Sequence, residues 1–565
     1  MRGWSIQARV AGLATVLFVV ITAAACGAAG DGSLQQHGGA PSGRVIGGAP
    51  GHPLLAVAIA RGRDLGRLPA GTQLHFTLGL AGRDVEGLAA ALAAGKRFSP
   101  GEFAARFGPG PAAVAGVRTT LARSGIATRW SYGETTLDAS GTAAAVDAFF
   151  KVRIDERVGP DGIRFHAPAH PVMVPAALAT VVNAVTGLDD YPGVQTTSLL
   201  GANGVTPHDM LDFYDATSAR SAGLDGTGST IVFVEIDRFN PDMLSMFAQK
   251  FNLPAFNVSV RSSGAWGNPG SEQGEADLDL EIAHGIAPGA RLVVYYSSPN
   301  SGNVAAAEAA AYRAFPQGAI ESKSLGSCEV PQAQSDATAL NDQTTSAAAQ
   351  GWTIFVASGD RGAYGCVPDG DFNTLSTNIA ASVPNVTAVG GTYALPSASG
   401  GYFKEAAWGE PVEQWGSGGG PSIFWPSPSW QVAPGARNQF SNGMRQTPDV
   451  SANADVESGW DVFAAGQETS VGGTSAAAPF WAAIIAIIDQ DLRAKGLPTV
   501  GFANPALYRF ARNPAGLPSP PFHDIGAGTN LYYPATPGWD FATGLGTPDV
   551  SALLSDFEWL QRSHG

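Results

Sequence analysis

Cysteine, histidine and charged residues are scarce in this chain of 565 residues. It has three cysteines and nine histidines, and 14% of its residues are charged. Basic residues are outnumbered, with 33 Lys and Arg against 48 Asp and Glu, and a net charge of −15 gives no electrostatic footprint for nucleic acid. A hydrophobic content of 44% argues against a disordered chain. The chain is too long for a single core, so we expect two or more domains.

The first 26 residues are predicted to be an export signal. Arg2 and Arg9 accompany an almost wholly apolar run over residues 10–25, which is short for a membrane span and ends in small residues. Cys26 follows three alanines, as in the lipid-carrying signal of bacterial lipoproteins, although Ala stands three positions before it where Leu is usual. We expect an exported protein, either secreted or lipid-anchored through Cys26 at the outer face of a bacterial membrane. Residues 27–53, rich in Gly, Ser, Gln and Ala, are predicted to be a flexible tether.

Only Cys328 and Cys366 remain beyond this signal. Both follow predicted strand ends, and in an oxidising compartment we expect them to form a disulfide. Two buried free thiols are the alternative.

Residues 54–190 have the pattern of a small α+β domain. A strand is predicted over residues 74–80 and helices over 85–94, 114–124 and 142–150. Ser99 and Pro100 form the cap and first position of another helix. Further strand-like segments are predicted at 128–137 and 152–163. Residues 191–204, rich in Pro, Gly and Thr, have the composition of an exposed linker open to proteolytic cleavage.

From residue 205 to 565 the chain alternates between apolar strands and helices. Buried strands are predicted at residues 229–236, 291–296 and 352–357, with an Ala-rich helix at 304–315 between the last two. This pattern indicates an α/β domain with a parallel sheet covered on both faces by helices.

The two regions differ in charge. Residues 51–200 hold 14 Lys and Arg against 12 Asp and Glu, whereas residues 201–565 hold 16 against 35. A slightly basic domain beside a strongly acidic one suits docking that weakens as carboxylates become protonated. An acidic surface that only keeps an exported protein soluble is the alternative.

The candidate nucleophile is Ser475, in Val471-Gly-Gly-Thr-Ser-Ala-Ala-Ala-Pro479. An apolar run over residues 480–488 predicts a buried helix with Pro479 in its first turn. A serine at a helix N-terminus lies where free N–H groups and the helix dipole stabilise a developing oxyanion. A Gly-Thr-Ser turn that merely caps a core helix is the alternative.

The segment at residues 274–285 carries four carboxylates on one predicted helix. Glu275 and Asp279 share one face, and Asp277 and Glu281 share roughly the opposite face. Like charges four residues apart destabilise a helix, so a function is expected: Glu275 and Asp279 would be a coupled base and its orienting partner at acidic pH. A solvated acidic face near a helix N-terminus is the alternative.

Histidine is a poor candidate for the base. The second domain has only four histidines, His208, His284, His523 and His564. His284 lies about 140° round the helix from Asp279 and does not share its face. A Ser/His/Asp site is therefore disfavoured.

Asp360 follows an apolar strand in Val356-Ala-Ser-Gly-Asp-Arg-Gly362. Ligand and catalytic groups of α/β sheets gather at such strand ends. Kept neutral by burial, its carboxyl would donate a hydrogen bond to an oxyanion. An aspartate that only forms a turn is the alternative.

These segments together resemble the sedolisin family of serine-carboxyl peptidases. The resemblance rests on Glu275-x-x-x-Asp279, Ser358-Gly-Asp360 and Gly473-Thr-Ser-Ala476, and covers about residues 205–550. It implies a subtilisin-like fold with a mainly parallel sheet flanked by helices, and residues 54–190 look like the family's inhibitory, ferredoxin-like activation prodomain. The subtilisin segment His-Gly-x-His is absent from the sequence, which argues against a neutral-pH enzyme of that sister family.

The resemblance implies a role for each residue. Ser475 would be the nucleophile, Glu275 its general base and Asp279 the partner of that base. Asp360 and the Ser475 N–H would form the oxyanion hole. The family commonly has Ser after this aspartate, whereas this chain has Arg361, whose charge would oppose the neutral form of Asp360.

The C-terminal segment resembles the family's calcium loop. By this resemblance one Ca²⁺ would take the carboxylates of Asp524 and Asp540 and the carbonyl oxygens of Ile525, Thr536 and Gly538. A Gly- and Pro-rich surface loop with two incidental aspartates is the alternative.

The sequence thus predicts an exported, monomeric acid endopeptidase acting on proteins or peptides, with its own prodomain as inhibitor. The alternatives are a tripeptidyl-peptidase of the same family and a surface binding protein on a catalytically impaired scaffold, which Arg361 would favour.

Overall fold

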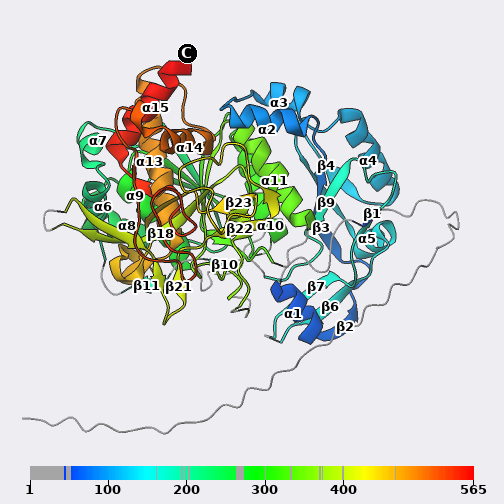
Figure 1. Ribbon diagram of the computed structural model, residues 1–565. Helices are drawn as coiled ribbons and strands as arrows, with labels where there is room; N and C mark the ends of the chain where they lie inside the picture. Colours follow the sequence, from blue (N-terminus) through cyan, green and yellow to red (C-terminus); the bar gives the residue numbers. More distant parts are fainter. Residues whose placement is uncertain are drawn as a thin grey trace, which may run out of the picture. The chain divides into compact units, whose positions relative to one another are not determined.

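The computed structural model describes residues 44–45, 53–160, 162–192, 195–196, 199–201, 204–262, 273–299, 301–330, 334–367, 371, 373–397, 400–464 and 466–564 (Figure 1). The predicted export signal, Cys26 and most of the predicted tether lie outside the described residues. Within the predicted tether, Arg44–Val45 form strand β1, which pairs antiparallel with β8 (Met173–Val174).

The N-terminal domain is built on a four-stranded antiparallel sheet, coloured blue to cyan in Figure 1. The strands lie in the spatial order β4 (Ala127–Arg129), β5 (Thr136–Thr142), β3 (Gln73–Leu80) and β9 (Val182–Thr186). Helices α2 (Val85–Ala93), α3 (Pro100–Arg106) and α4 (Pro111–Arg123) separate β3 from β4, and α5 (Ala143–Phe150) follows β5. This β-α-β-β-α-β order is that of a ferredoxin-like domain, as predicted.

Local sequence explains these elements. Leu74, Phe76 and Leu78 alternate into the core along β3. Ser99 caps α3 through a capping box with Glu102, whose carboxylate accepts from Ser99 N at 2.9 Å. The remaining elements of this domain are α1 (Pro53–Arg61), β2 (Arg63–Arg67), β6 (Ile154–Val158) and β7 (Arg164–Pro168).

The second domain contains a mainly parallel sheet. Its order is β13 (Val258–Ser262), β14 (Arg291–Tyr296), β12 (Thr230–Glu235), β15 (Ile320–Lys323), β17 (Thr353–Ala357), β18 (Thr387–Pro396) and β19 (Tyr402–Ala407), and β24 (Val450–Asn453) also pairs with β18. Only the β18–β19 pair is antiparallel. The predicted α/β architecture is confirmed.

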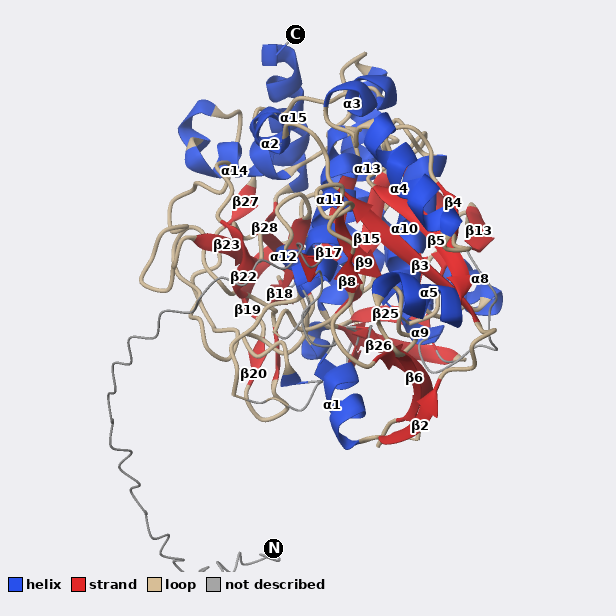
Figure 2. Ribbon diagram, turned by 90° about the vertical axis from the view of Figure 1, so that its right-hand side faces the viewer, coloured by secondary structure: helices blue, strands red, loops and turns tan. Residues whose placement is uncertain are grey.

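Helices cover both faces of this sheet, as Figure 2 shows. Helices α9 (Gln273–Ile286) and α13 (Thr474–Ala494) pack on one face, and α10 (Ser301–Ala314) and α11 (Gln334–Ala349) on the other. The other helices and strands are α6 (Pro207–Phe213), α7 (Thr217–Ser221), α8 (Pro241–Lys250), α12 (Ile379–Ser382), α14 (Asn504–Arg512), α15 (Val550–His564), β20 (Gly409–Glu410), β21 (Trp415–Gly416), β22 (Gly420–Pro426), β23 (Met444–Thr447), β25 (Trp460–Ala464), β27 (Phe522–His523) and β28 (Thr547–Pro548).

Helix α13 is the central helix of the second domain. Among the described helices it alone is long and apolar enough to cross a membrane, but 94% of its apolar window is buried inside the protein, so it is a core helix. The prediction that Pro479 lies in its first turn is wrong, since the helix begins at Thr474 and Pro479 lies in its second turn. Proline has no N–H to bond the Ser475 carbonyl, which the Ser324 hydroxyl approaches at 3.4 Å.

Two strand predictions need correction, and one strand was missed. The segment predicted at 128–137 is two strands, β4 and β5, joined by a turn. The segment predicted at 152–163 contains only β6, which ends at Val158, and its antiparallel partner β7 begins at Arg164. Strand β15 was not predicted, because Ile-Glu-Ser-Lys reads as a polar loop although all four residues are buried.

Candidate active site

Ser475 and Glu275 meet at the starts of two buried helices. Ser475 is the second residue of α13, and its Oγ donates a hydrogen bond to Oε1 of Glu275, the third residue of α9. The two side chains are 0% and 2% exposed. A hydroxyl that donates to a carboxylate in a dry site has the geometry that general-base activation requires. The predicted pair therefore meets although its members are 200 positions apart in the sequence.

Asp279 follows Glu275 by one turn of α9 and is held from two sides. Ser324 Oγ donates to Asp279 Oδ1 at 2.8 Å, and the carboxyl of Glu235, the last residue of β12, hydrogen-bonds the Asp279 carboxyl. Burial, and then the negative charges of Glu235 and Glu275, raise the pKa of Asp279 well above its usual value. Two such carboxyls share one proton.

The opposite face of α9 is also buried, which contradicts the alternative of a solvated acidic face. Asp277 Oδ1 accepts from Asn240 N at 2.5 Å, and Glu281 Oε2 accepts from Phe463 N at 2.7 Å. Burial raises the pKa of Asp277 to about 7 and that of Glu281 to about 10. These two carboxyls connect α9 to the segments beside it.

Asp360 lies at the carboxyl end of β17, beside the first residue of α13. Its Oδ1 accepts hydrogen bonds from Thr474 N at 2.7 Å and Thr474 Oγ1 at 2.8 Å. Its Oδ2 is buried and has no hydrogen-bond partner among the residues that the structure describes. Burial raises the pKa of Asp360 to about 7. Below that pH the carboxyl carries a proton that Oδ2 can donate.

Arg361 has little influence on this carboxyl. Its charge lowers the pKa of Asp360, but by less than the two bonds from Thr474 do, and burial outweighs all three. The backbone of Arg361 forms a parallel bridge with Gly416. The cation therefore does not reverse the effect of burial.

Histidines lie in other environments. His284 stacks on Phe256 with ring centroids 3.8 Å apart, its Nε2 lies 2.7 Å from Pro254 O, and burial lowers its pKa to about 4. His523 stacks on Tyr402, again at 3.8 Å, and burial lowers its pKa to about 4. These contacts agree with the prediction that histidine is not the base.

The backbone of the predicted linker pairs with strands that flank the site. Strand β10 (Gln195–Thr196) pairs antiparallel with β16 (Leu325–Gly326), which follows Ser324 directly. Strand β11 (Leu199–Gly201) pairs antiparallel with the end of β26 (Gln467–Gly472), so that Leu199 lies opposite Gly472, three residues before Ser475. Strands β10 and β11 thus lie beside the strands that flank the site.

Cys328 and Cys366 form a disulfide with their Cα atoms 4.9 Å apart, as predicted. Both residues are buried. Cys328 lies two residues after β16 and Cys366 six residues after Asp360. The disulfide therefore ties the strand that pairs with the linker to the loop that carries Asp360.

Asp524 and Asp540 converge on one turn near the C-terminus. Asp524 accepts from Gly538 N at 2.9 and 3.0 Å through its two oxygens, and Asp540 Oδ2 accepts from Thr536 N at 2.8 Å. Among the described side chains, no group of three or more His, Cys, Asp or Glu gathers as a metal cluster. Carboxylate oxygens are among the ligands that Ca²⁺ prefers, although here they accept hydrogen bonds from backbone N–H groups.

Sequence analysis missed three residues of the site: Glu235, Ser324 and Thr474. An acidic residue ending an otherwise apolar strand was a usable signal for Glu235, because buried carboxylates are rarely left unpaired. Ser324 follows the polar strand β15, whose sequence gave no sign of burial.

Family models match both domains. Residues 60–191 match the model described as Pro-kumamolisin, activation domain, and residues 263–502 match the model of the Subtilase family.

Three relatives and one solved structure extend these matches. Kumamolisin of Bacillus sp. (strain MN-32) is 34% identical over 446 residues, covering 74% of this chain and 77% of the relative. Sedolisin of Pseudomonas sp. (strain 101) is 30% identical over 499 residues, covering 81% of each. Tripeptidyl-peptidase 1 of Rattus norvegicus is 29% identical over 442 residues, covering 70% and 74%. The structure of Pseudomonas sedolisin, a serine-carboxyl proteinase complexed with two molecules of pseudo-iodotyrostatin, aligns with a TM-score of 0.55 and 30% identity, covering 64% of this chain and 99% of that one.

Proposed function

Because the chain belongs to the sedolisin family of serine-carboxyl peptidases, we propose that it is a secreted acid endopeptidase made as a self-processing zymogen. The observation that carries this proposal is the buried hydrogen bond from Ser475 Oγ to Glu275 Oε1. The activation domain before the peptidase domain supports an intramolecular inhibitor, and peptides or proteins are the substrates.

The reaction is acyl transfer. Ser475 Oγ attacks the carbonyl carbon of the scissile peptide bond while its proton passes to Glu275 Oε1. The Ser475 N–H and the protonated Asp360 Oδ2 donate to the oxyanion that forms. Glu275 then gives its proton to the leaving amine, and an ester of Ser475 remains. Water, deprotonated by Glu275, hydrolyses this ester and regenerates the serine.

The proposed pH range follows from the carboxyls that must hold protons. Asp360 donates to the oxyanion only below its pKa of about 7. Asp279, with its raised pKa, holds the proton that it shares with Glu235 and keeps that side of Glu275 neutral. Histidine, protonated in acid, would not serve as a base in this range.

An endopeptidase is favoured by the paths of β10 and β11. An endopeptidase must accept a chain that continues in both directions from the cut, and the linker backbone pairs with β16 on one side and β26 on the other. A tripeptidyl-peptidase of the same family is the second candidate, because such an enzyme is among the relatives. A peptide with a blocked amino terminus separates them: the endopeptidase cleaves it, whereas a tripeptidyl-peptidase needs a free amino terminus.

The zymogen is tested by the mass of the purified chain lacking residues 1–26, held at pH 4. We expect it to shorten by cleavage between Thr196 and Leu199, where the linker passes from β16 to β26, and Ser475→Ala to stay intact. An intact parent chain would contradict the proposal and favour the binding protein.

One Ca²⁺ is part of the proposal. Asp524 and Asp540 would supply carboxylates, and Ile525, Thr536 and Gly538 would supply carbonyl oxygens. When bound, the ion holds the C-terminal loop together and takes no part in the reaction.

Export and lipid attachment are also proposed from residues 1–26 alone. Incorporation of labelled palmitate into the parent chain and not into Cys26→Ser tests the anchor, and its absence with recovery of the protein from the medium indicates plain secretion.

A further inference from the structure

Arg97 of the N-terminal domain inserts its side chain into the second domain, far from the site. Its Nη1 donates to Thr499 Oγ1 at 3.0 Å, and its Nη2 donates to the carbonyl oxygens of Thr499 and Val500. These acceptors follow the C-terminal end of α13, whose N-terminal end carries Ser475. Ser475 and Asp489 lie 14 residues apart on α13. At a rise of 1.5 Å per residue the two residues are roughly 20 Å apart.

The acceptors form a slot that other peptidase residues hold in place. We call the space between Gly351 and Gly501, with the carbonyls of Thr499 and Val500, the guanidinium slot. A Cβ on Gly501 would lie 2.5 Å from Arg97 Nε, and one on Gly351 would lie 3.7 Å from Arg97 Cδ, so glycines flank the side chain from two separate loops.

Two hydrogen bonds within the second domain hold the loop that carries the slot. Asp489 Oδ1 accepts from Val500 N at 2.7 Å, and the Thr353 hydroxyl donates to Gly501 O at 2.6 Å. The carboxylate of Asp489 also attracts the Arg97 cation. The bonds from Val500 N and the Thr353 hydroxyl both lie within the second domain.

The residue after Arg97 strengthens this contact. Phe98 N donates to Ala349 O at 2.8 Å, and the Phe98 ring packs with Phe103 and Phe107 against Ala348 and Ala349 at the end of α11. An arginine fork beside an aromatic anchor is the composition of a binding hot spot.

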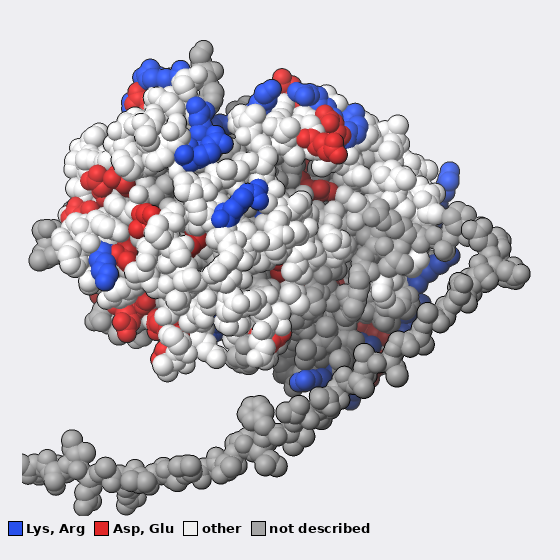
Figure 3. All heavy atoms as spheres, in the orientation of Figure 1, with Lys and Arg blue, Asp and Glu red and all other residues white. Residues whose placement is uncertain are grey.

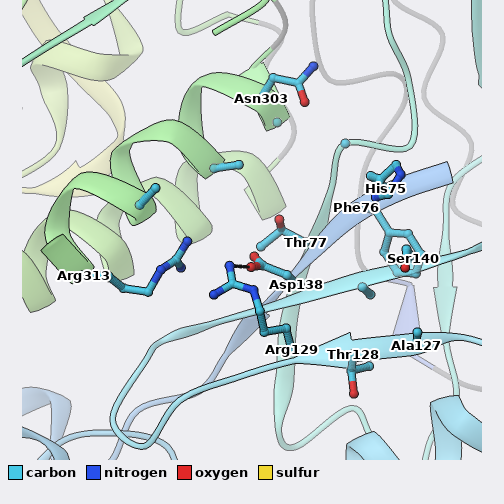
Figure 4. Close-up of a pocket in the computed structure, with 15 residues that line it drawn as sticks. His75, Phe76, Thr77, Ala127, Thr128, Arg129, Asp138, Ser140, Asn303 and Arg313 are labelled. Carbon is cyan, nitrogen blue, oxygen red and sulfur yellow. Dashed lines mark hydrogen bonds and ion pairs between the residues drawn. The ribbon is translucent and has the colours of Figure 1, made fainter. Parts of the chain in front are cut away.

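The remainder of the contact between the two domains is more open. A cavity of about 900 Å³ lies between the sheet of the N-terminal domain and α10. Arg313 of α10 projects into it (Figure 4). Arg313 Nε lies 3.7 Å from Glu134, which is a loose and partly exposed ion pair. Asn183 Nδ2 donates to Asp342 Oδ2 at 2.6 Å.

Figure 3 shows Lys and Arg near the top of the molecule, over α2 and α14, and Asp and Glu mostly at the left, over α6 and α8.

We propose that the guanidinium slot is a binding site remote from the catalytic residues, and that it keeps the N-terminal domain bound after the linker has been cut. This inference rests on the proposed zymogen function. A cut near Ser475 leaves the Arg97 contacts untouched, so the severed domain remains a non-covalent ligand of the peptidase.

The test uses the full-length Ser475→Ala chain, whose linker is cut by added thermolysin at Leu199 or Leu200. Size-exclusion chromatography over a range of dilutions then gives the dissociation constant of the two fragments. We expect the cut chain to co-elute at micromolar concentration. Arg97→Ala should raise the dissociation constant roughly 10- to 100-fold, the usual effect of losing hydrogen bonds from a charged group. The dissociation constant of Arg97→Lys should lie between those of the parent and Arg97→Ala, because an ammonium does not reproduce the planar fork of a guanidinium.

Lys96→Ala is the matched control, since Lys96 is the exposed neighbour with the same charge, and its dissociation constant should stay within twofold of the parent value. If Arg97→Ala disturbs folding, as circular dichroism before the cut would show, Thr499→Val tests the slot from the peptidase side with an expected rise of about 3- to 10-fold. Ethylguanidinium should displace the fragment from the parent at concentrations where ethylammonium does not.

Two results would contradict the proposed role of the guanidinium slot. One is separation of the parent fragments at micromolar concentration, and the other is equal dissociation constants for Arg97→Ala and Lys96→Ala. Because thermolysin makes the cut, these results do not depend on catalysis. Failure of the Ser475-containing chain to cut itself at pH 4 would count against the zymogen alone.

Discussion

Asp360 offers a hydrogen-bond donor that can be altered with little change of shape. Asp360→Asn keeps an oxygen for the two bonds from Thr474 and places an amide group where Oδ2 lies. An amide donates at every pH, whereas the Asp360 carboxyl, with its pKa raised to about 7 by burial, donates only when protonated. We expect Asp360→Asn to remain active in acid and to keep its activity further into the alkaline range.

The magnitudes follow from the cost of losing one oxyanion donor. Asp360→Ala removes the donor and should lower kcat about 10²- to 10³-fold, or about 2.7–4 kcal/mol. Asp360→Asn retains a donor and should stay within about tenfold of the parent at pH 4. As the pH rises through about 7, the parent loses the Asp360 proton, and its kcat should fall about tenfold per pH unit.

The assay is hydrolysis of an internally quenched peptide between pH 3 and pH 9, with the activated forms of the parent, Asp360→Asn and Asp360→Ala. Arg361→Ser belongs in the same series. Removing this cation should move the alkaline limb of the kcat profile upward by only about a fraction of a pH unit, because Arg361 affects the pKa of Asp360 less than burial or the Thr474 bonds do.

Two results would refute the reasoning. Equal losses for Asp360→Asn and Asp360→Ala at pH 4 would mean that Asp360 does not act as a donor. If the fall of kcat at alkaline pH is the same in Asp360→Asn as in the parent, a group other than Asp360 causes that fall.

Three further predictions concern the base, the loop and the disulfide. Glu275→Gln should abolish self-processing at pH 4 and lower kcat on the order of 10²- to 10⁴-fold. Its melting temperature should stay near that of Ser475→Ala. A normal processing rate, measured by mass spectrometry, would contradict the assignment of Glu275 as the base. Calcium at 100 times its Kd should stabilise the parent by about 2.7 kcal/mol in a melting experiment and stabilise Asp540→Asn much less; equal shifts would argue against the site. Cys328→Ser combined with Cys366→Ser opens a loop of 38 residues and should cost about 4 kcal/mol of unfolding free energy on the chain-entropy model, and a loss below about 1 kcal/mol would show that the unfolded chain is little constrained by it.

The site could be predicted from sequence where its members lie in short motifs. Glu275 and Asp279 share a helix face because their spacing is one helical turn, and Ser475 precedes an apolar run that could only be a buried helix. The sequence could not place these two helices side by side. That arrangement depends on the order of the parallel strands beneath them.

Other parts of the site depend on tertiary contacts with no local signal. Strand β15 carries Glu321 and Lys323, which read as exposed residues but are buried beside Tyr312 and Glu308, whose side chains bond them. Ser324 follows that strand, so its bond to Asp279 was missed together with the strand. Arg97 was equally invisible, because its partners at Thr499 and Val500 lie about 400 residues away.

Helix α9 shows how the burial of acidic residues makes the stability of a fold depend on pH. Burial raises the pKa of Asp277 from 3.8 to about 7 and that of Glu281 from 4.5 to about 10. A group whose folded pKa is raised stabilises the fold below its unfolded pKa, and this contribution is lost as the pH rises through the folded value; for Asp277 it is on the order of 4 kcal/mol. The melting temperature of Ser475→Ala should therefore fall between pH 4 and pH 8. Glu281→Gln, which keeps an acceptor for Phe463 N, should flatten this fall, and Glu413→Gln on the exposed surface should not. A melting temperature that rises over this range in Ser475→Ala would mean that these carboxyls are ionised in the folded protein and stabilised by contacts other than burial.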